Sequence, residues 1–513
     1  MKKLRKYLAL LMACLMLVVL LSGCSSGGKS DNGSKEQPSG SEVGTVNDNN
    51  NADNDGWTGI GSADDPVEVS IILKDIFSDD EDTQALFNEI EKKMAAHGQY
   101  IDLVLLEPPA SDYSTALALS LRSGELKPDI IYFQGGDETI ADEGLLEDLT
   151  SYIENSTHVK VMLEEYNEER LENYPYLLYP STPNVKTPVI RSDFAEQLDS
   201  YDALIEEPSV DNYYTFFKEM VDSGLVEYAF TTDGSIARLD SIFNHAFGVT
   251  GTIVQEDGKW IYSMASQAEK DKLEFYAKLY ADGLLEPSYV TNTWDVMEQN
   301  FYDGKVGVIS GTAGDVIQVY NTKMTSLNDE SASLTVLPPA SGVSQSYLSV
   351  DNTKESRGYA IHADSDVKEA AFAVLEFMAS PEGRLLDKVG IEGIHYEIQD
   401  NQLVFTDDFA SWWARIFPTP LNLNPEIPLA EPILSDAAQS SIDQVMDFYY
   451  ADTNILIPED MTAMYDAMTS LYEEYATNIV TGKADISTFD EFVEKFNEAG
   501  GDAFSDYFQE VLN

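Results

Sequence analysis

The segment between residues 66 and 135 alternates between the two hydrophobic periods of regular secondary structure. Three apolar runs typical of buried strands cover 67–73, 101–106 and 129–133, and two segments with the apolar stripe of a helix separate them. Strands joined through helices pair in parallel, with the helices packed on the faces of the sheet. This order predicts an α/β lobe whose ligands bind beyond the carboxyl ends of the strands.

A second region, from about 190 to 335, combines helices with strands in a similar way. Short strands are predicted at 305–310 and 334–337. A strand at 358–361 and a helix at 368–378 then return to the first pattern, and the C-terminus is helical, its last helix ending at Gly500-Gly501. A chain of 513 residues is long enough for two such lobes with separate cores.

The N-terminus has the order of a secretory signal. Lys2, Lys3, Arg5 and Lys6 precede an apolar run over 7–21, which is followed by Ser22, Gly23 and Cys24. The run is shorter than the ~20 residues of a membrane-spanning helix, so removal of 1–23 is favoured over a retained anchor. The sequence Leu21-Ser22-Gly23-Cys24 resembles the bacterial lipoprotein box, which predicts lipidation of Cys24 and a protein held to the extracellular face of the cell membrane.

Residues 24–65 consist mainly of Ser, Gly, Asn and Asp. Such a segment has too little apolar surface to offset the entropy of ordering, and we expect a flexible tether with a span of roughly 35 Å. Asn51, Asp53 and Asp55 imitate the start of a calcium loop, but Ser62 stands where the bidentate Glu is needed.

Charge and cysteine content exclude several classes of function. The 90 acidic residues against 31 basic ones give a net charge of −59, which argues against binding to nucleic acid or to anionic lipid through the protein surface. The two cysteines, Cys14 and Cys24, lie in the signal and at the lipidation site, so the mature chain has no disulfide. The five histidines lack paired spacing, and we predict no metal and no cofactor.

Five segments, in this order, resemble the family 1 extracellular solute-binding proteins, which capture carbohydrates for ABC importers: 121–131, 144–149, 190–195, 378–383 and 390–396. The resemblance implies a two-lobed, periplasmic-binding-protein-like (type II) α/β fold. Each lobe is then a mostly parallel sheet flanked by helices, with 66–185 plus 340–400 in the N-terminal lobe and 186–339 plus 401–513 in the C-terminal lobe.

The same resemblance implies a mechanism without catalysis. A monomer would bind an oligosaccharide or another small solute in the cleft between its lobes, close around it by a hinge motion, and deliver it to the permease subunits of an ABC transporter. No catalytic residue is predicted.

Candidate ligand-binding residues come from position and residue type. Sugars offer apolar C–H faces to aromatic rings and hydroxyl groups to polar side chains. The candidates at strand ends are Asp75, Phe77, Gln134, Asp137 and Glu138. A predicted helix of the second lobe adds Asp240 and Asn244, and three tryptophans add stacking surfaces, Trp294, Trp412 and Trp413.

Arg357 and Glu392 are further candidates, because each precedes a glycine, Gly358 and Gly393; hinge salt bridges or turn caps are equally good explanations for both. Core or interlobe packing is the alternative for each tryptophan. Trp260 lies in a hairpin-like stretch and is not a candidate.

Two other functions remain open from the sequence. The same fold would serve a binding protein for peptides or polyols. A secreted glycoside hydrolase needs two carboxylates, which an acidic chain offers by chance, but no nucleophile–base arrangement stands out.

Overall fold

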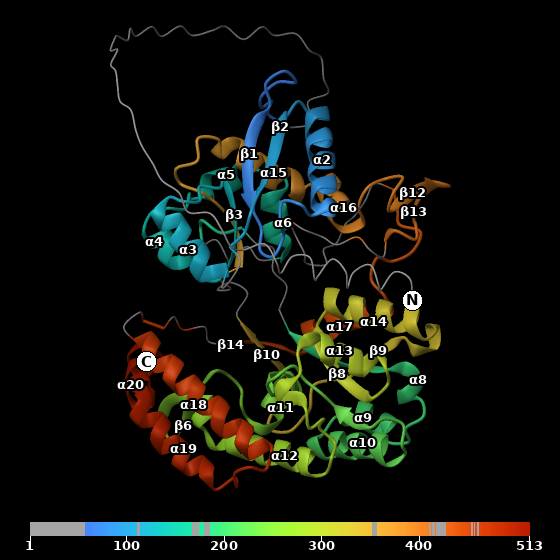
Figure 1. Cartoon of the computed structure of the whole chain (residues 1–513), viewed down its shortest axis with the longest axis vertical. Helices are drawn as coiled ribbons and strands as arrows, with labels where there is room; N and C mark the ends of the chain where they lie inside the picture. Colours follow the sequence, from blue (N-terminus) through green and yellow to red (C-terminus); the bar gives the residue numbers. More distant parts are fainter. Residues whose placement is uncertain are drawn as a thin grey trace, which may run out of the picture. The chain divides into compact units, whose positions relative to one another are not determined.

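A four-stranded sheet with the order β11-β3-β1-β2 forms the centre of the first lobe (Figure 1). The computed structural model describes residues 57–512 except 110–112, 167–173, 179–184, 351–356, 410–411, 413–415, 417–426, 453–454, 456 and 459–460. The strands are β1 (Val67–Ile72), β2 (Ile101–Leu106), β3 (Ile130–Gln134) and β11 (Arg357–Ile361). β1 runs parallel to β2 and β3, as the sequence predicts, and β11 is antiparallel to β3.

Alternation along these strands divides the apolar side chains between two faces. Val69 and Ile71 join a core with α2 (Glu81–Ala96), α6 (Val159–Tyr166) and α15 (Lys368–Ala379). Ile72 and Ile131 point the other way, into a core with α3 (Tyr113–Ser123) and α4 (Asp137–Asp142). The remaining helices of this lobe are α5 (Thr150–Glu154) and α16 (Pro381–Val389).

The second lobe is built on a sheet with the order β5-β8-β4-β9. Its strands are β4 (Lys186–Arg191), β5 (Tyr228–Phe230), β8 (Val306–Thr312) and β9 (Leu334–Val336). β5 and β8 are parallel, but β4 is antiparallel to both β8 and β9, so this sheet is mixed rather than mostly parallel. A helical crossover enforces parallel pairing only between the strands that it joins, here β5 and β8. The two-lobed α/β fold class is otherwise confirmed.

Helices cover both faces of the second sheet. One core is shared by α10 (Val210–Asp222), α11 (Ala237–Phe247), α12 (Gln267–Ala281) and the C-terminal helices α18 (Thr462–Val480), α19 (Thr488–Phe496) and α20 (Asp502–Leu512). Another is shared by α13 (Trp294–Tyr302), α14 (Asp315–Leu327) and α17 (Asp436–Phe448). Further described elements of this lobe include α8 (Ser192–Ala195), α9 (Tyr201–Glu206), β6 (Ile253–Glu256) and β7 (Lys259–Tyr262).

Two small ribbons complete the strands. β10 (Tyr347–Val350) runs parallel to β14 (Tyr449–Asp452), and β12 (Tyr396–Gln399) forms a hairpin with β13 (Gln402–Phe405). The hairpin shares a small core with Val389 of α16. The lobe boundary predicted at 400/401 therefore falls inside the turn of a hairpin that packs on the first lobe. No helix in the described ranges is both long enough and apolar enough to cross a membrane.

The predicted tether ends too late. Residues 57–65 belong to the first lobe, because the Trp57 ring packs 5.4 Å from the rings of both His97 and His158. Ile60 also exchanges backbone hydrogen bonds with this lobe, donating to Gly98 and accepting from Tyr100. Trp57 and Ile60 supply the apolar surface that the preceding Ser/Gly/Asn-rich sequence lacks.

The helix that starts with α19 breaks at Gly500, as predicted, but it is not the last helix, because α20 follows directly. Gly500 has φ 149°, and a Cβ there would lie 2.8 Å from the Cβ of Met464. This glycine kinks the chain between two helices and allows α18 to approach closely.

A buried lysine and its hydrogen-bonded partners link the helices α11, α12 and α18. The Nζ atom of Lys272 lies 2.8 Å from carboxylate oxygens of both Asp240 and Glu269 and donates to Asn244 Oδ1 at 2.7 Å. Tyr472 of α18 donates to Glu269 at 2.7 Å. Burial alone would lower the pKa of Lys272, but the two carboxylates outweigh burial and raise it, so the ammonium stays charged.

We predict that Lys272→Met lowers the free energy of unfolding by about 3–5 kcal/mol, because it leaves carboxylates in the core without their cation. Urea denaturation followed by circular dichroism measures this loss. Lys278→Met is the matched control on α12: its ion pair with Asp282 is half exposed, and exposed pairs contribute little. Equal losses in the two variants would contradict the prediction.

Candidate functional site

Trp294 presents an indole ring at one end of the second sheet. It is the first residue of α13 and is 41% exposed. The Arg238 guanidinium covers its ring, with Cζ 4.8 Å from the ring centroid, and the indole N–H donates to Glu298. These contacts fix the orientation of the ring before any ligand arrives.

Arg238 is itself held in place by the strands of the sheet. Although charged, it is only 2% exposed; it makes two hydrogen bonds of 2.6 Å to the Asp233 carboxylate and donates to the carbonyl oxygen of Ser310. Asp233 follows β5 and Ser310 lies on β8. Because these two strands are parallel, both residues lie at the same end of the sheet, called the ligand-candidate edge below. Burial alone would raise the pKa of Asp233, but hydrogen bonding to Arg238 and its charge outweigh burial and lower it.

Lys186 belongs to the same edge. In the antiparallel register it stands opposite Thr312, the last residue of β8. Burial and the nearby positive charge of Arg238 lower the pKa of Lys186, against the opposing effect of Asp233. The ligand-candidate edge therefore combines one aromatic surface with two cations and a carboxylate.

The first lobe offers a second cluster, at the carboxyl ends of β1 and β3. Asp75 has φ 59° and pairs with Lys74 at 2.7 Å, and Phe77 exposes 44% of its surface. Gln134 and Arg357 are direct partners in the β3–β11 register. The structure thus brings four predicted residues, from three separate segments, to one end of one sheet.

Asp137 and Glu138 begin α4 beside this end, and two tyrosines engage their carboxylates. Tyr176 donates to Asp137 at 3.1 Å, and Tyr174 donates to Glu138 at 3.0 Å. Asp137 is fully buried, and burial raises the pKa of Glu138. Both carboxylates therefore help to hold the segment 174–178 against the lobe.

The other predicted residues lie elsewhere. Asp240 and Asn244 bind Lys272 within the helical core described above. The Trp412 indole N–H donates to the Asp387 carbonyl at 2.9 Å, and its ring packs 4.3 Å from His395. Glu392 is exposed between α16 and β12. Trp413 and Cys24 lie outside the described residues.

Sequence reasoning missed Lys186, Asp233, Arg238, Tyr174 and Tyr176. The run Thr231-Thr232-Asp233-Gly234 is a visible turn signal, but β5 has only three residues and gives no pattern of its own. Arg238 lies in an amphipathic helix, where a basic residue is ordinarily read as facing solvent.

The chemistry of these clusters is that of binding. A fixed indole surface, an amide and several charged groups can recognise a ring with hydroxyl substituents. Within the described part of the chain, no group of three or more His, Cys, Asp and Glu side chains is arranged to hold a metal ion.

We predict that Asp233→Asn lowers the free energy of unfolding by about 3 kcal/mol, because it leaves the buried Arg238 guanidinium without its counter-charge. It should also change the fluorescence of Trp294, whose ring Arg238 covers. Chemical denaturation and the emission spectrum test both effects. Asp222→Asn, which removes half of an exposed ion pair, is the control and should alter neither.

Comparison with known proteins supplies independent findings. The family model described as bacterial extracellular solute-binding protein matches residues 79–385. Lipoprotein LipO of Bacillus subtilis (strain 168) is 20% identical over 274 residues, which are 50% of this chain and 53% of that protein. The chain thus matches about half the length of this curated relative.

Solved structures share the fold over most of the chain. The alginate-binding protein AlgQ2 aligns with a TM-score of 0.59 and 18% identity, covering 87% of this chain and 97% of that one. FusA of S. pneumoniae, in complex with kestose, has a TM-score of 0.61 and 15% identity, covering 87% and 99%. The N-glycan transport solute-binding protein NgtS of Streptococcus pneumoniae has a TM-score of 0.61 and 15% identity, covering 84% and 95%.

Proposed function

Because the chain belongs to the bacterial extracellular solute-binding proteins, we propose that it captures an oligosaccharide between its two lobes and delivers it to an ABC importer. The observation that carries the sugar assignment is the Trp294 ring, partly exposed and fixed by Arg238 and Glu298. A pre-oriented ring binds a sugar face without first losing side-chain entropy. The names of three fold relatives agree, since they describe binding of alginate, of kestose and of an N-glycan.

In this proposal the two strand-end clusters have complementary roles. The second lobe supplies the stacking surface through Trp294, and the first lobe supplies hydrogen-bonding groups through Gln134, Asp75 and Arg357. Closure follows binding only if the solute interacts with both clusters at once, since a ligand shifts a conformational equilibrium by its differential affinity.

Two competing functions can be distinguished from this proposal by experiment. A peptide- or polyol-binding protein would use the same lobes but would not need a fixed indole. A glycoside hydrolase would release product from a chromogenic glycoside, whereas a binding protein is stabilised by its ligand and leaves it intact.

We expect at least one oligosaccharide in a panel of neutral and acidic types to raise the melting temperature of the protein. The same oligosaccharide should be recovered chemically unchanged after incubation with the protein. Trp294→Ala should then raise the Kd of that oligosaccharide about tenfold or more, while Trp294→Phe should keep most of the affinity because it keeps a ring. Titration calorimetry measures both.

Leu327→Ala is the control for loss of an exposed apolar side chain in the same lobe, since Leu327 is 64% exposed at the end of α14. If no oligosaccharide shifts the melting temperature while a peptide or polyol does, the carbohydrate assignment is wrong.

We further propose that lipid on Cys24 anchors the protein to the outer face of the cell membrane. The support is the signal-like order of residues 1–24 and the lipoprotein relative. Cys24→Ala should move the protein, expressed in a bacterial host, from the detergent phase to the aqueous phase in a Triton X-114 partition. Cys14→Ala, within the signal run, should leave partition unchanged. Detergent-phase recovery of Cys24→Ala would disprove lipid anchoring at this residue.

A further inference from the structure

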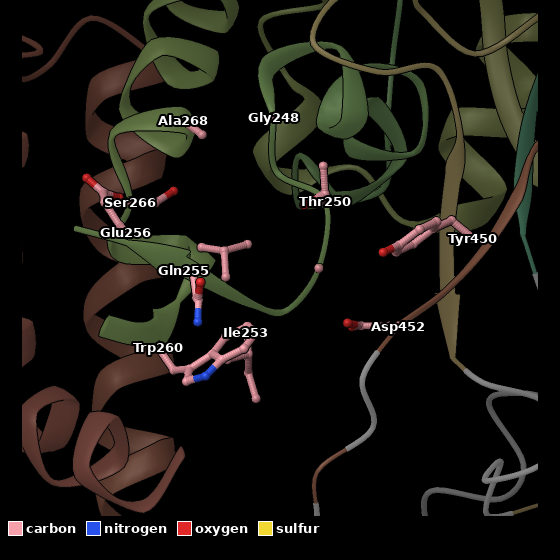
Figure 2. Close-up of a pocket in the computed structure, with 12 residues that line it drawn as sticks. Gly248, Thr250, Ile253, Gln255, Glu256, Trp260, Ser266, Ala268, Tyr450 and Asp452 are labelled. Atoms are coloured by element: carbon pink, nitrogen blue, oxygen red, sulfur yellow. The ribbon is translucent and has the colours of Figure 1, made fainter. Parts of the chain in front are cut away.

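A cavity of about 340 Å³ lies in the second lobe, and none of the described residues predicted to bind ligand, Trp294 included, lines it. Its walls come from the β6–β7 hairpin, the start of α12, the loop after α11 and strand β14 (Figure 2). Its size falls within the usual ~300–1,000 Å³ of small-molecule sites.

Two aromatic side chains line this cavity. Figure 2 shows Tyr450 and Asp452 on one side of the space and Trp260 and Gln255 on the other. Tyr450 is 51% exposed, and the ring of His245 packs against it at 5.2 Å in an edge-on arrangement. The Trp260 Nε1 atom is buried and has no hydrogen-bond partner among the described residues.

The polar groups that line the cavity indicate which class of ligand it suits. Gln255, Glu256 and Asp452 contribute amide and carboxylate groups, and the described residues that line the cavity include no lysine or arginine. Asp452 also fixes the loop beside the cavity, because its carboxylate accepts the backbone N–H of Thr252 at 3.0 Å and the Thr252 hydroxyl. Aromatic surfaces with acceptors and without cations suit a neutral, hydroxyl-rich ring and disfavour an anion.

The cavity and the Trp294 surface lie at opposite ends of one helix. Arg238, which covers Trp294, is in the first turn of α11, and Gly248, which lines the cavity, follows its last residue. At 1.5 Å per residue these positions are about 15 Å apart along the helix. An oligosaccharide that contacts both must be extended over at least this distance.

We propose that this cavity is a second saccharide subsite, which holds a neutral sugar unit distant from the unit stacked on Trp294. The proposal rests on the oligosaccharide-binding function proposed above. It adds that affinity depends on chain length, since only a ligand long enough to span α11 contacts Tyr450, Trp260 and Gln255 as well as Trp294.

The test uses graded series of neutral gluco-, manno-, xylo- and fructo-oligosaccharides, from disaccharides to hexasaccharides, titrated into the full mature chain by calorimetry. For the series that binds, Tyr450→Ala and Gln255→Ala should each raise the Kd of the longest members about tenfold and leave that of the disaccharide unchanged. Met446→Ala is the matched control, because Met446 is an exposed apolar side chain on α17 that does not line the cavity.

Each result decides one claim. Unchanged affinity at every length in both variants, or equal weakening of short and long ligands, overturns the subsite while binding through Trp294 stands. Failure of every neutral oligosaccharide to bind the unmodified chain overturns the subsite, and the carbohydrate function is overturned as well if the acidic members of the panel above also do not bind. Gln255 is exposed, so its variant tests the subsite even if Tyr450→Ala fails to fold.

Discussion

The buried Arg238 guanidinium is the group on which the end of the second sheet that carries Trp294 depends. It binds Asp233 in the loop after β5 and the main-chain carbonyl of Ser310 on β8, and so connects the two. The face of the guanidinium packs on the ring of Trp294. A guanidinium buried in this way is tolerated only where its charge and its donors are satisfied. The same requirement that holds the strands together therefore also fixes the aromatic surface offered to a ligand.

The first lobe could be predicted well from the sequence because its strands are buried on both faces and read as continuous apolar runs, as β1 and β3 do. The second sheet could be predicted less well. β5 is only three residues long, and the pairing of β4 with β8 and β9 joins segments that no short-range pattern relates.

The candidate site shows the same limit. Strand ends predict Asp75, Phe77 and Gln134, because the end of a parallel strand is visible in the sequence. Arg357 is predicted from its place before Gly358, and the β3–β11 register sets it beside Gln134. Residue type alone does not separate Asp240, whose carboxylate neutralises a buried lysine, from Asp233, which supports the site. That distinction depends on which charged side chain from another element lies within reach, and only the packed structure contains this information.

Trp57 has a mechanical consequence. Residues 57–65 are fastened to the first lobe through the rings of His97 and His158 and through the backbone of Ile60. Any force transmitted from the N-terminus therefore acts on the first lobe and reaches the second only through the connections between them. If Cys24 carries the lipid proposed above, the first lobe is the one joined to the membrane, and the proposed closure would move the second lobe, which carries Trp294 and the cavity beside Tyr450, relative to it.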